Sequence, residues 1–130
     1  MNTSYYSKSG KDPNAVSIAG RAPDGYTGRQ YKKLAPKVWF FKKYKEDGDE
    51  AFYTEQYQRE VLDKLDPKEV FLELGDNAIL LCWEAPGKFC HRHLVAKWLE
   101  EKLGITVPEL NEKGRPVKSD LEITNLFESD

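Results

Sequence analysis

Cysteine, histidine and methionine are scarce in this sequence, and long apolar runs are absent. The 130 residues include two Cys, two His and one Met. Two cysteines are too few for the disulfide framework that stabilises many small secreted domains. The longest uncharged apolar stretch, residues 77–83, has the length of a strand, whereas a membrane helix needs about 20 apolar residues. We therefore expect a protein without a membrane segment and without a disulfide scaffold.

The first residues also lack the apolar core of a secretory signal. This absence predicts a cytoplasmic location, where thiols stay reduced. Cys82 and Cys90 are accordingly expected to be thiols and not a disulfide. Cys82 follows the apolar residues 79–81, and we interpret it as a packing residue.

Net charge is small, but it conceals two opposed regions. The chain has 20 Lys+Arg and 22 Asp+Glu, a formal charge of -2. Residues 1–45 carry ten basic and two acidic residues, and residues 46–77 carry three basic and eleven acidic residues. This distribution favours pairing within the protein over a polyanionic partner. An alternative function uses the basic, aromatic segment 26–45 as a protein or nucleic-acid interaction module.

The hydrophobic pattern predicts one α/β domain at residues 15–110, a flexible arm at 1–14 and a polar, acidic tail at 111–130. Strands are expected at 15–19 and 78–83, with a further strand at 105–107. Helical patterns cover 36–45, 49–65, 67–74 and about 90–103. The expected fold is a compact three-layer α/β domain with a short, mainly parallel sheet and helices on both faces.

Chemically versatile side chains gather around the second strand and the last helix. Trp83 and Glu84 follow the strand, and Cys90, His91 and Arg92 begin the helix. Ligands of open α/β sheets bind where strands end and helices begin, and a helix N-terminus favours anions and thiolates. The helical phase directs His91 inward with residues 94 and 95, and directs His93 outward. These positions form the candidate site.

Three interpretations of the site remain open. In the first, Cys90 is a nucleophile, His91 assists proton transfer, and Glu84 orients groups or acts as an acid or base. In the second, the site binds a small anion such as a nucleotide or phosphate ester. Arg92, Arg21 and Arg29 would then hold the charge, and Trp83 or a loop tyrosine would stack on a base. No cofactor is expected.

In the third interpretation, zinc is bound by four residues: Cys82, Cys90, His91 and His93. It is the weakest of the three, because successive helical residues diverge by about 100° and the sequence has no Cys-x-x-Cys pair. No metal site is therefore expected.

The segment around these residues resembles a known family. Residues 80–84 read Leu-Leu-Cys-Trp-Glu, and residues 89–95 read Phe-Cys-His-Arg-His-Leu-Val. Together with the region 15–104, they are similar to the signature of the uncharacterised bacterial and phage proteins named domain of unknown function 488. The resemblance implies a small α/β fold with a site at Glu84, Cys90, His91 and Arg92. It implies no particular reaction.

Overall fold

The computed structural model describes residues 1–84, 88–111 and 113–117. Within these residues, one sheet has the strand order β3-β2-β4-β1-β5-β6. Strands β1 to β5 are parallel, and β6 is antiparallel to β5. The strands are β1 (Asn2–Tyr5), β2 (Ala15–Ser17), β3 (Arg29–Gln30), β4 (Ile79–Cys82), β5 (Glu109–Leu110) and β6 (Pro116–Val117).

The helices begin and end at residues suited to those positions. Asp49 and Asp66 accept backbone hydrogen bonds at the starts of α3 (Glu50–Glu60) and α4 (Pro67–Leu74). Glycines with positive φ follow α2 (Val38–Asp47) and α5 (His91–Leu103). The predicted helix at 49–65 is divided, because α3 ends at Glu60 and a 3-10 turn follows at Leu62–Lys64. The helices are α1 (Tyr6–Ser9), α2 (Val38–Asp47), α3 (Glu50–Glu60), α4 (Pro67–Leu74) and α5 (His91–Leu103), with another 3-10 turn at Lys32–Leu34.

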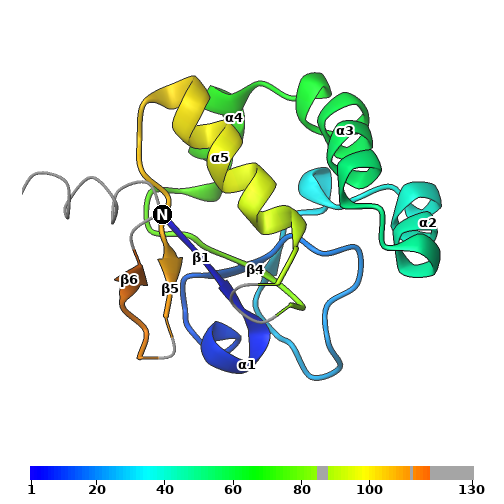
Figure 1. Cartoon of the computed structure of the whole chain (residues 1–130). Helices are drawn as coiled ribbons and strands as arrows, with labels where there is room; N and C mark the ends of the chain where they lie inside the picture. Colours follow the sequence, from blue (N-terminus) through cyan, green and yellow to red (C-terminus); the bar gives the residue numbers. More distant parts are fainter. Residues whose placement is uncertain (85–87, 112, 118–130) are drawn as a thin grey trace, which may run out of the picture.

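The three layers of the domain differ in thickness. Helices α3, α4 and α5 lie over one face of the sheet, and the short α1 lies on the other (Figure 1). Val16 and Leu80 belong to the larger core cluster with residues from α2–α5, whereas Ile79 and Leu81 belong to a smaller cluster that packs against Tyr6. This arrangement confirms the predicted three-layer α/β fold with a mainly parallel sheet.

The arm expected at residues 1–14 instead holds a strand of the sheet, residues 2–5, and the short helix α1. Strand β1 lies between β4 and β5, with Thr3 opposite Leu80 and Glu109. The hydropathy of β1 is low because its buried side chains are those of Thr3 and Ser4. The Thr3 hydroxyl hydrogen-bonds to the Glu109 carboxylate (2.6 Å), and the Ser4 hydroxyl hydrogen-bonds to Ser9 Oγ (2.7 Å). A strand whose buried hydroxyls are hydrogen-bonded therefore cannot be predicted from a pattern of apolar residues.

The strand predicted at 105–107 is also displaced along the chain. Those residues form no strand, and β5 begins at Glu109. Part of the expected tail belongs to β6, while residues 112 and 118–130 lie outside the described residues. Among the described residues, no helix has the length and apolarity needed to cross a bilayer.

Candidate functional site

A cavity of about 800 Å³ lies beside the ends of β2 and β4, between α2 and the start of α5. This is the edge of the sheet to which all the parallel strands point their carboxyl ends. Five of the predicted site residues line the cavity, together with Cys82: Arg21, Trp83, Glu84, Cys90 and His91. The structure therefore brings the end of β4 and the beginning of α5 together around one space.

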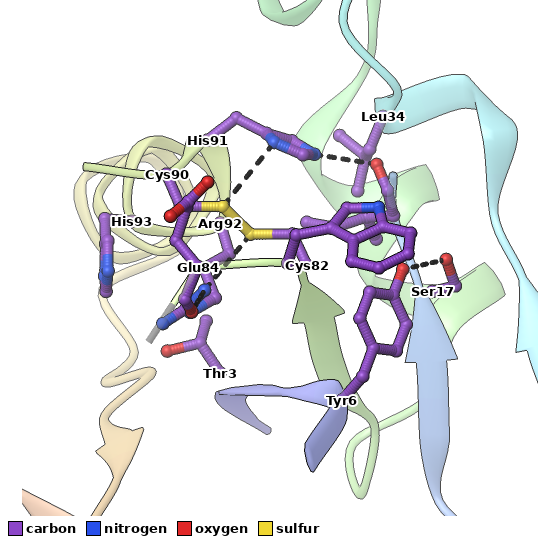
Figure 2. The surroundings of a disulfide bond; sticks show 12 residues. Thr3, Tyr6, Ser17, Leu34, Cys82, Glu84, Cys90, His91, Arg92 and His93 are labelled. Carbon is purple, nitrogen blue, oxygen red and sulfur yellow. Dashed lines mark hydrogen bonds between the residues drawn. A yellow bond between two sulfur atoms is a disulfide. The ribbon is translucent and has the colours of Figure 1, made fainter. Parts of the chain in front are cut away.

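Cys82 and Cys90 are joined by a disulfide, with their Cα atoms 7.1 Å apart (Figure 2). The expectation that both are free thiols is wrong for this structure. Cys82 is the last residue of β4, and Cys90 is the N-cap of α5 with an extended backbone. Because the parallel strand delivers the chain to the helix start, the two buried sulfurs meet at the wall of the cavity.

His91 points inward, as its helical phase predicts. Its Nε2 lies 2.7 Å from the carbonyl oxygen of Ile18, and its Nδ1 lies 3.8 Å from Cys90 Sγ. A carbonyl only accepts, so Nε2 carries the proton and donates it. Burial lowers the pKa of His91 to about 4, although the bond to Ile18 opposes this shift. The imidazole is therefore neutral at pH 7, with the Nδ1 lone pair directed at Cys90.

Arg92 is fully buried and has an internal partner. Its Nε and Nη2 donate to the two carboxylate oxygens of Glu109, at 3.0 and 2.7 Å. Its Nη1 donates to the Glu84 carbonyl (2.7 Å) and to Cys82 Sγ (3.2 Å). Arg92 does not line the cavity. The geometry gives it a positioning role between β4, β5 and α5 and does not support the predicted contact with a ligand anion.

Glu109 is the partner of Arg92, and the sequence does not predict this pair. Burial raises the pKa of its carboxyl, but hydrogen bonds from Arg92 and Thr3 outweigh burial and leave the pKa below its ordinary value. The carboxylate is therefore ionised at neutral pH. The sequence does not indicate that Glu109 lies on a strand, because the strand is predicted at residues 105–107.

Glu84 and Trp83 lie at the rim of the cavity. The Glu84 carboxylate is half exposed and 3.8 Å from Lys45 Nζ. The Trp83 indole is 55% exposed, and its Nε1 donates to the Arg21 carbonyl at 2.8 Å. Its ring also meets Tyr6 edge-on, at a centroid distance of 5.3 Å. Arg21 itself is solvent-exposed, with its guanidinium 3.8 Å from Asp24.

Arg29 and His93 lie away from the cavity lining. The Arg29 guanidinium donates to the carbonyls of Glu73 and Leu74, both at 2.9 Å, at the end of α4. A cation there satisfies terminal carbonyls of that helix. His93 is partly exposed and its Nε2 lies 3.9 Å from Glu109, so it is on the other side of α5 from His91.

One stripe of α2 supplies further residues of the cavity lining, none of which was among the predicted site residues. Residues 38, 41, 42 and 45 recur at helical spacing and line the cavity. Lys42 and Lys45 add two cations to that of Arg21, and Glu84 supplies the one carboxylate among the lining residues that the structure describes. Since His91 is neutral, the charged lining is net positive. The helical spacing of Val38, Phe41 and the two lysines is the sequence feature that could have indicated their common position at the cavity.

Three potential metal-donor atoms also lie together: the sulfurs of Cys82 and Cys90, and a ring nitrogen of His91. All three are within 4.8 Å of one another, and all three residues are buried. Among the side chains that the structure describes, every buried nitrogen or oxygen has a hydrogen-bond partner. The chemistry available at the cavity wall is therefore that of two sulfurs and one imidazole lone pair.

A comparison with protein-family models gives a match. A family model described as "Active DUF488-N3 subclade" (DUF488-N3a) matches residues 8–103, well over half of the chain. No curated protein and no solved structure matches the sequence.

Proposed function

Because the chain belongs to the DUF488 family, within the N3a subclade, we propose that its cavity binds a small anionic, nucleotide-like ligand. We further propose that the Cys90 thiol performs chemistry on that ligand. The observation that carries the proposal is the 800 Å³ cavity with cations at its rim and the Cys90–His91 pair in its wall. Small-molecule sites in proteins have volumes of roughly 300–1,000 Å³.

The cations of the cavity support an anionic ligand. Arg21, Lys42 and Lys45 line it, and the only carboxylate in the described lining, Glu84, is 3.8 Å from Lys45. A phosphate would attract these flexible cations and compete with Glu84 for Lys45. The positive charge lies at the rim, where an anion remains partly hydrated.

The aromatic side chains support a planar group on the ligand. Tyr44, Tyr53 and Phe89 pack together at centroid distances of 5.2–5.4 Å and line the inner part of the cavity. The exposed Trp83 offers a further ring at the rim. Aromatic faces stack on any nucleobase, so the lining suits a nucleotide better than a bare phosphate.

The thiol step requires the reduced protein. Two molecules of a small thiol convert the disulfide to two Cys thiols and become a disulfide themselves. The Cys90 S–H then faces the Nδ1 lone pair of His91. As the sulfur bonds an electrophilic atom of the ligand, the proton passes to Nδ1, and the leaving group departs with its electron pair. A subclade described as active is in keeping with such a step.

Native mass spectrometry of the purified, reduced protein tests ligand binding, followed by calorimetric titration with inorganic phosphate and the four ribonucleoside monophosphates. A nucleotide is expected to bind more tightly than phosphate, and Lys45→Ala is expected to weaken it about tenfold. Lys113→Ala is the matched control, because Lys113 is exposed and not part of the lining. Equal, weak binding of all five probes would contradict the proposal.

Exposed hydrophobic side chains on α2 support the alternative of an interaction module. Val38 and Trp39 are 65% and 51% exposed in the basic segment 26–45. An interaction with nucleic acid through this segment would weaken steeply with salt and be unaffected by Cys90→Ala. Fluorescence anisotropy with a labelled single-stranded DNA distinguishes the two functions.

A further inference from the structure

We infer that Cys82, Cys90 and His91, once the disulfide is reduced, form a binding site for a single thiophilic divalent cation, Zn²⁺ above all, with its open coordination position toward the cavity. This inference goes beyond the proposed ligand binding, because it concerns the dithiol itself. The two sulfurs and the imidazole come from the end of β4 and the start of α5 (Figure 2).

The spacing of the Cys90 and His91 donor atoms fits one ion, and the two sulfurs, which are bonded to each other in the oxidised protein, have to separate to a similar spacing once the disulfide is reduced. Bond lengths of about 2.3 Å to sulfur and 2.0 Å to nitrogen place the donors of a tetrahedral zinc roughly 3.5–3.8 Å apart. Cys90 Sγ and His91 Nδ1 are 3.8 Å apart, and all three donors lie within 4.8 Å. The Cα separation of Cys82 and Cys90, 7.1 Å, exceeds the usual disulfide range of about 4.4–6.8 Å. An ion between the sulfurs suits that backbone separation.

The backbone of Cys90 removes one of the two objections that the sequence raised against zinc. Successive residues of a helix diverge by about 100°. Cys90, however, precedes the helix, with φ -156° and ψ 146°. Its extended conformation lets its side chain converge with that of His91, the first helical residue. That objection assumed that both residues are helical, whereas Cys90 is not; the absence of a Cys-x-x-Cys pair, the other reason for expecting no metal site, is unchanged.

The surroundings of the donors are those of metal ligands. His91 Nε2 donates to the Ile18 carbonyl, which leaves Nδ1 as the lone-pair nitrogen on the side of the sulfurs. Ligating histidines almost always hold their second nitrogen in this way. Arg92 Nη1 donates to Cys82 Sγ, a contact that stabilises a thiolate. The second shell is therefore present around these donors.

Charge balance also favours a divalent ion in this buried place. Two thiolates and a neutral imidazole neutralise one M²⁺, and the two thiol protons leave with solvent. The adjacent Arg92 charge is already balanced by Glu109 at 2.7 Å. The loaded site would thus add no net charge to the interior, so its desolvation cost is small compared with that of an isolated ion.

Three protein donors leave a fourth position for water or a ligand atom, as in catalytic zinc sites. All three donor residues line the 800 Å³ cavity, so this position faces the space proposed for the anion. The disulfide and the loaded site exclude each other, because both use the same sulfurs. In the loaded form Cys90 is a ligand and its thiol step does not occur.

Metal analysis of the full chain tests the inference. The protein is reduced with a phosphine, loaded with Zn²⁺ or Co²⁺, and freed of unbound metal on a desalting column. One Zn²⁺ per chain is expected by mass spectrometry. The Co²⁺ form should show intense tetrahedral d–d bands and sulfur-to-cobalt charge-transfer bands. Oxidation of the loaded wild-type protein with diamide should release the ion.

Substitutions assign the ligands. Cys82→Ser, Cys90→Ser and His91→Ala should each weaken binding at least 100-fold in competition with a chromogenic chelator, while His93→Ala, on the far side of α5, should leave it unchanged. Circular dichroism verifies that each variant is folded, and Cys82→Ser preserves the His91–Ile18 contact if His91→Ala does not fold. A folded, reduced wild-type protein that retains no metal would overturn the inference, as would cobalt bands without sulfur charge transfer. Nucleotide titration of the metal-free protein tests the proposed function separately.

Discussion

The residues at the start of α5 lie on two sides with different roles, although they are neighbours in sequence. On one side, Cys90 and His91 line the cavity. On the other, Arg92 is fully buried and paired with Glu109. Proximity in a motif therefore does not imply a shared role. Cys90 and His91 line the cavity, whereas the neighbouring Arg92 guanidinium connects α5 with β5 and with the residue that follows Trp83 after β4.

The largest effect that separates these sides should come from Arg92→Ala. Removing the cation leaves the half-buried Glu109 carboxylate without its partner, and such losses cost about 3–5 kcal/mol. The free energy of unfolding, measured in urea, is expected to fall by that amount. Glu109→Gln is the matched variant, and its free energy of unfolding should fall less, since the amide oxygen still accepts a hydrogen bond from Arg92. A stable Arg92→Ala protein that binds no nucleotide would instead return Arg92 to the ligand site.

The next effect concerns the cavity side. In the reduced protein, His91→Ala should slow alkylation of Cys90 by iodoacetamide roughly 100-fold, because the base facing the thiol is lost. His93→Ala should change the rate little, as its ring lies near Glu109. Peptide mass spectrometry separates modification of Cys90 from that of Cys82. Equal rates in the two histidine variants would break the proposed pairing of Cys90 with His91.

Acid should lower the free energy of unfolding by protonating Glu109, the partner of Arg92. The pKa of this carboxyl is lowered in the fold, so it binds a proton more readily when the chain is unfolded. The stability that it contributes is present above its unfolded pKa of about 4.5 and is lost as the pH falls from there through the folded pKa. Urea unfolding at a series of pH values should show a shallower acid decline for Glu109→Gln than for wild type. Identical slopes would contradict an ionised Glu109.

The smallest effect compares the two arginines predicted to bind a ligand. Arg29→Ala should lower the free energy of unfolding by about 1 kcal/mol, because two carbonyls at the end of α4 lose a charged donor. Nucleotide affinity should not change. Arg21→Ala should show the reverse, since its side chain is exposed at the cavity rim. A loss of affinity in Arg29→Ala would place that guanidinium in the site after all.

Much of the fold was predictable because its signals are local. Apolar residues 79–82 and the pairing of Asp66 with Pro67 specify β4 and the start of α4 without tertiary information. Strand β1 could not be found in this way. Its buried Thr3 and Ser4 depend on hydrogen-bond partners 106 and 5 residues away, which the apolar pattern does not reveal.

The candidate site was predictable where helical phase decided the outcome and not where tertiary partners did. Phase placed His91 inward, and the structure confirms it. The role of Arg92 depends on Glu109, which comes from another strand. The convergence of Cys82 with Cys90 depends on the extended backbone at residue 90. The predicted helix began at about residue 90, one residue before α5, so it did not show this conformation.

The proton on His91 is held by a backbone atom, and this fact bears on how the site can be redesigned. The Ile18 carbonyl accepts from Nε2, and the Ile18 amide donates to Leu81 at the neighbouring strand. No substitution at position 18 that keeps the backbone in place removes this acceptor. An engineer who wants the other tautomer would have to alter the path of the chain after β2, for example by inserting a residue, because side-chain exchange there leaves the imidazole as it is.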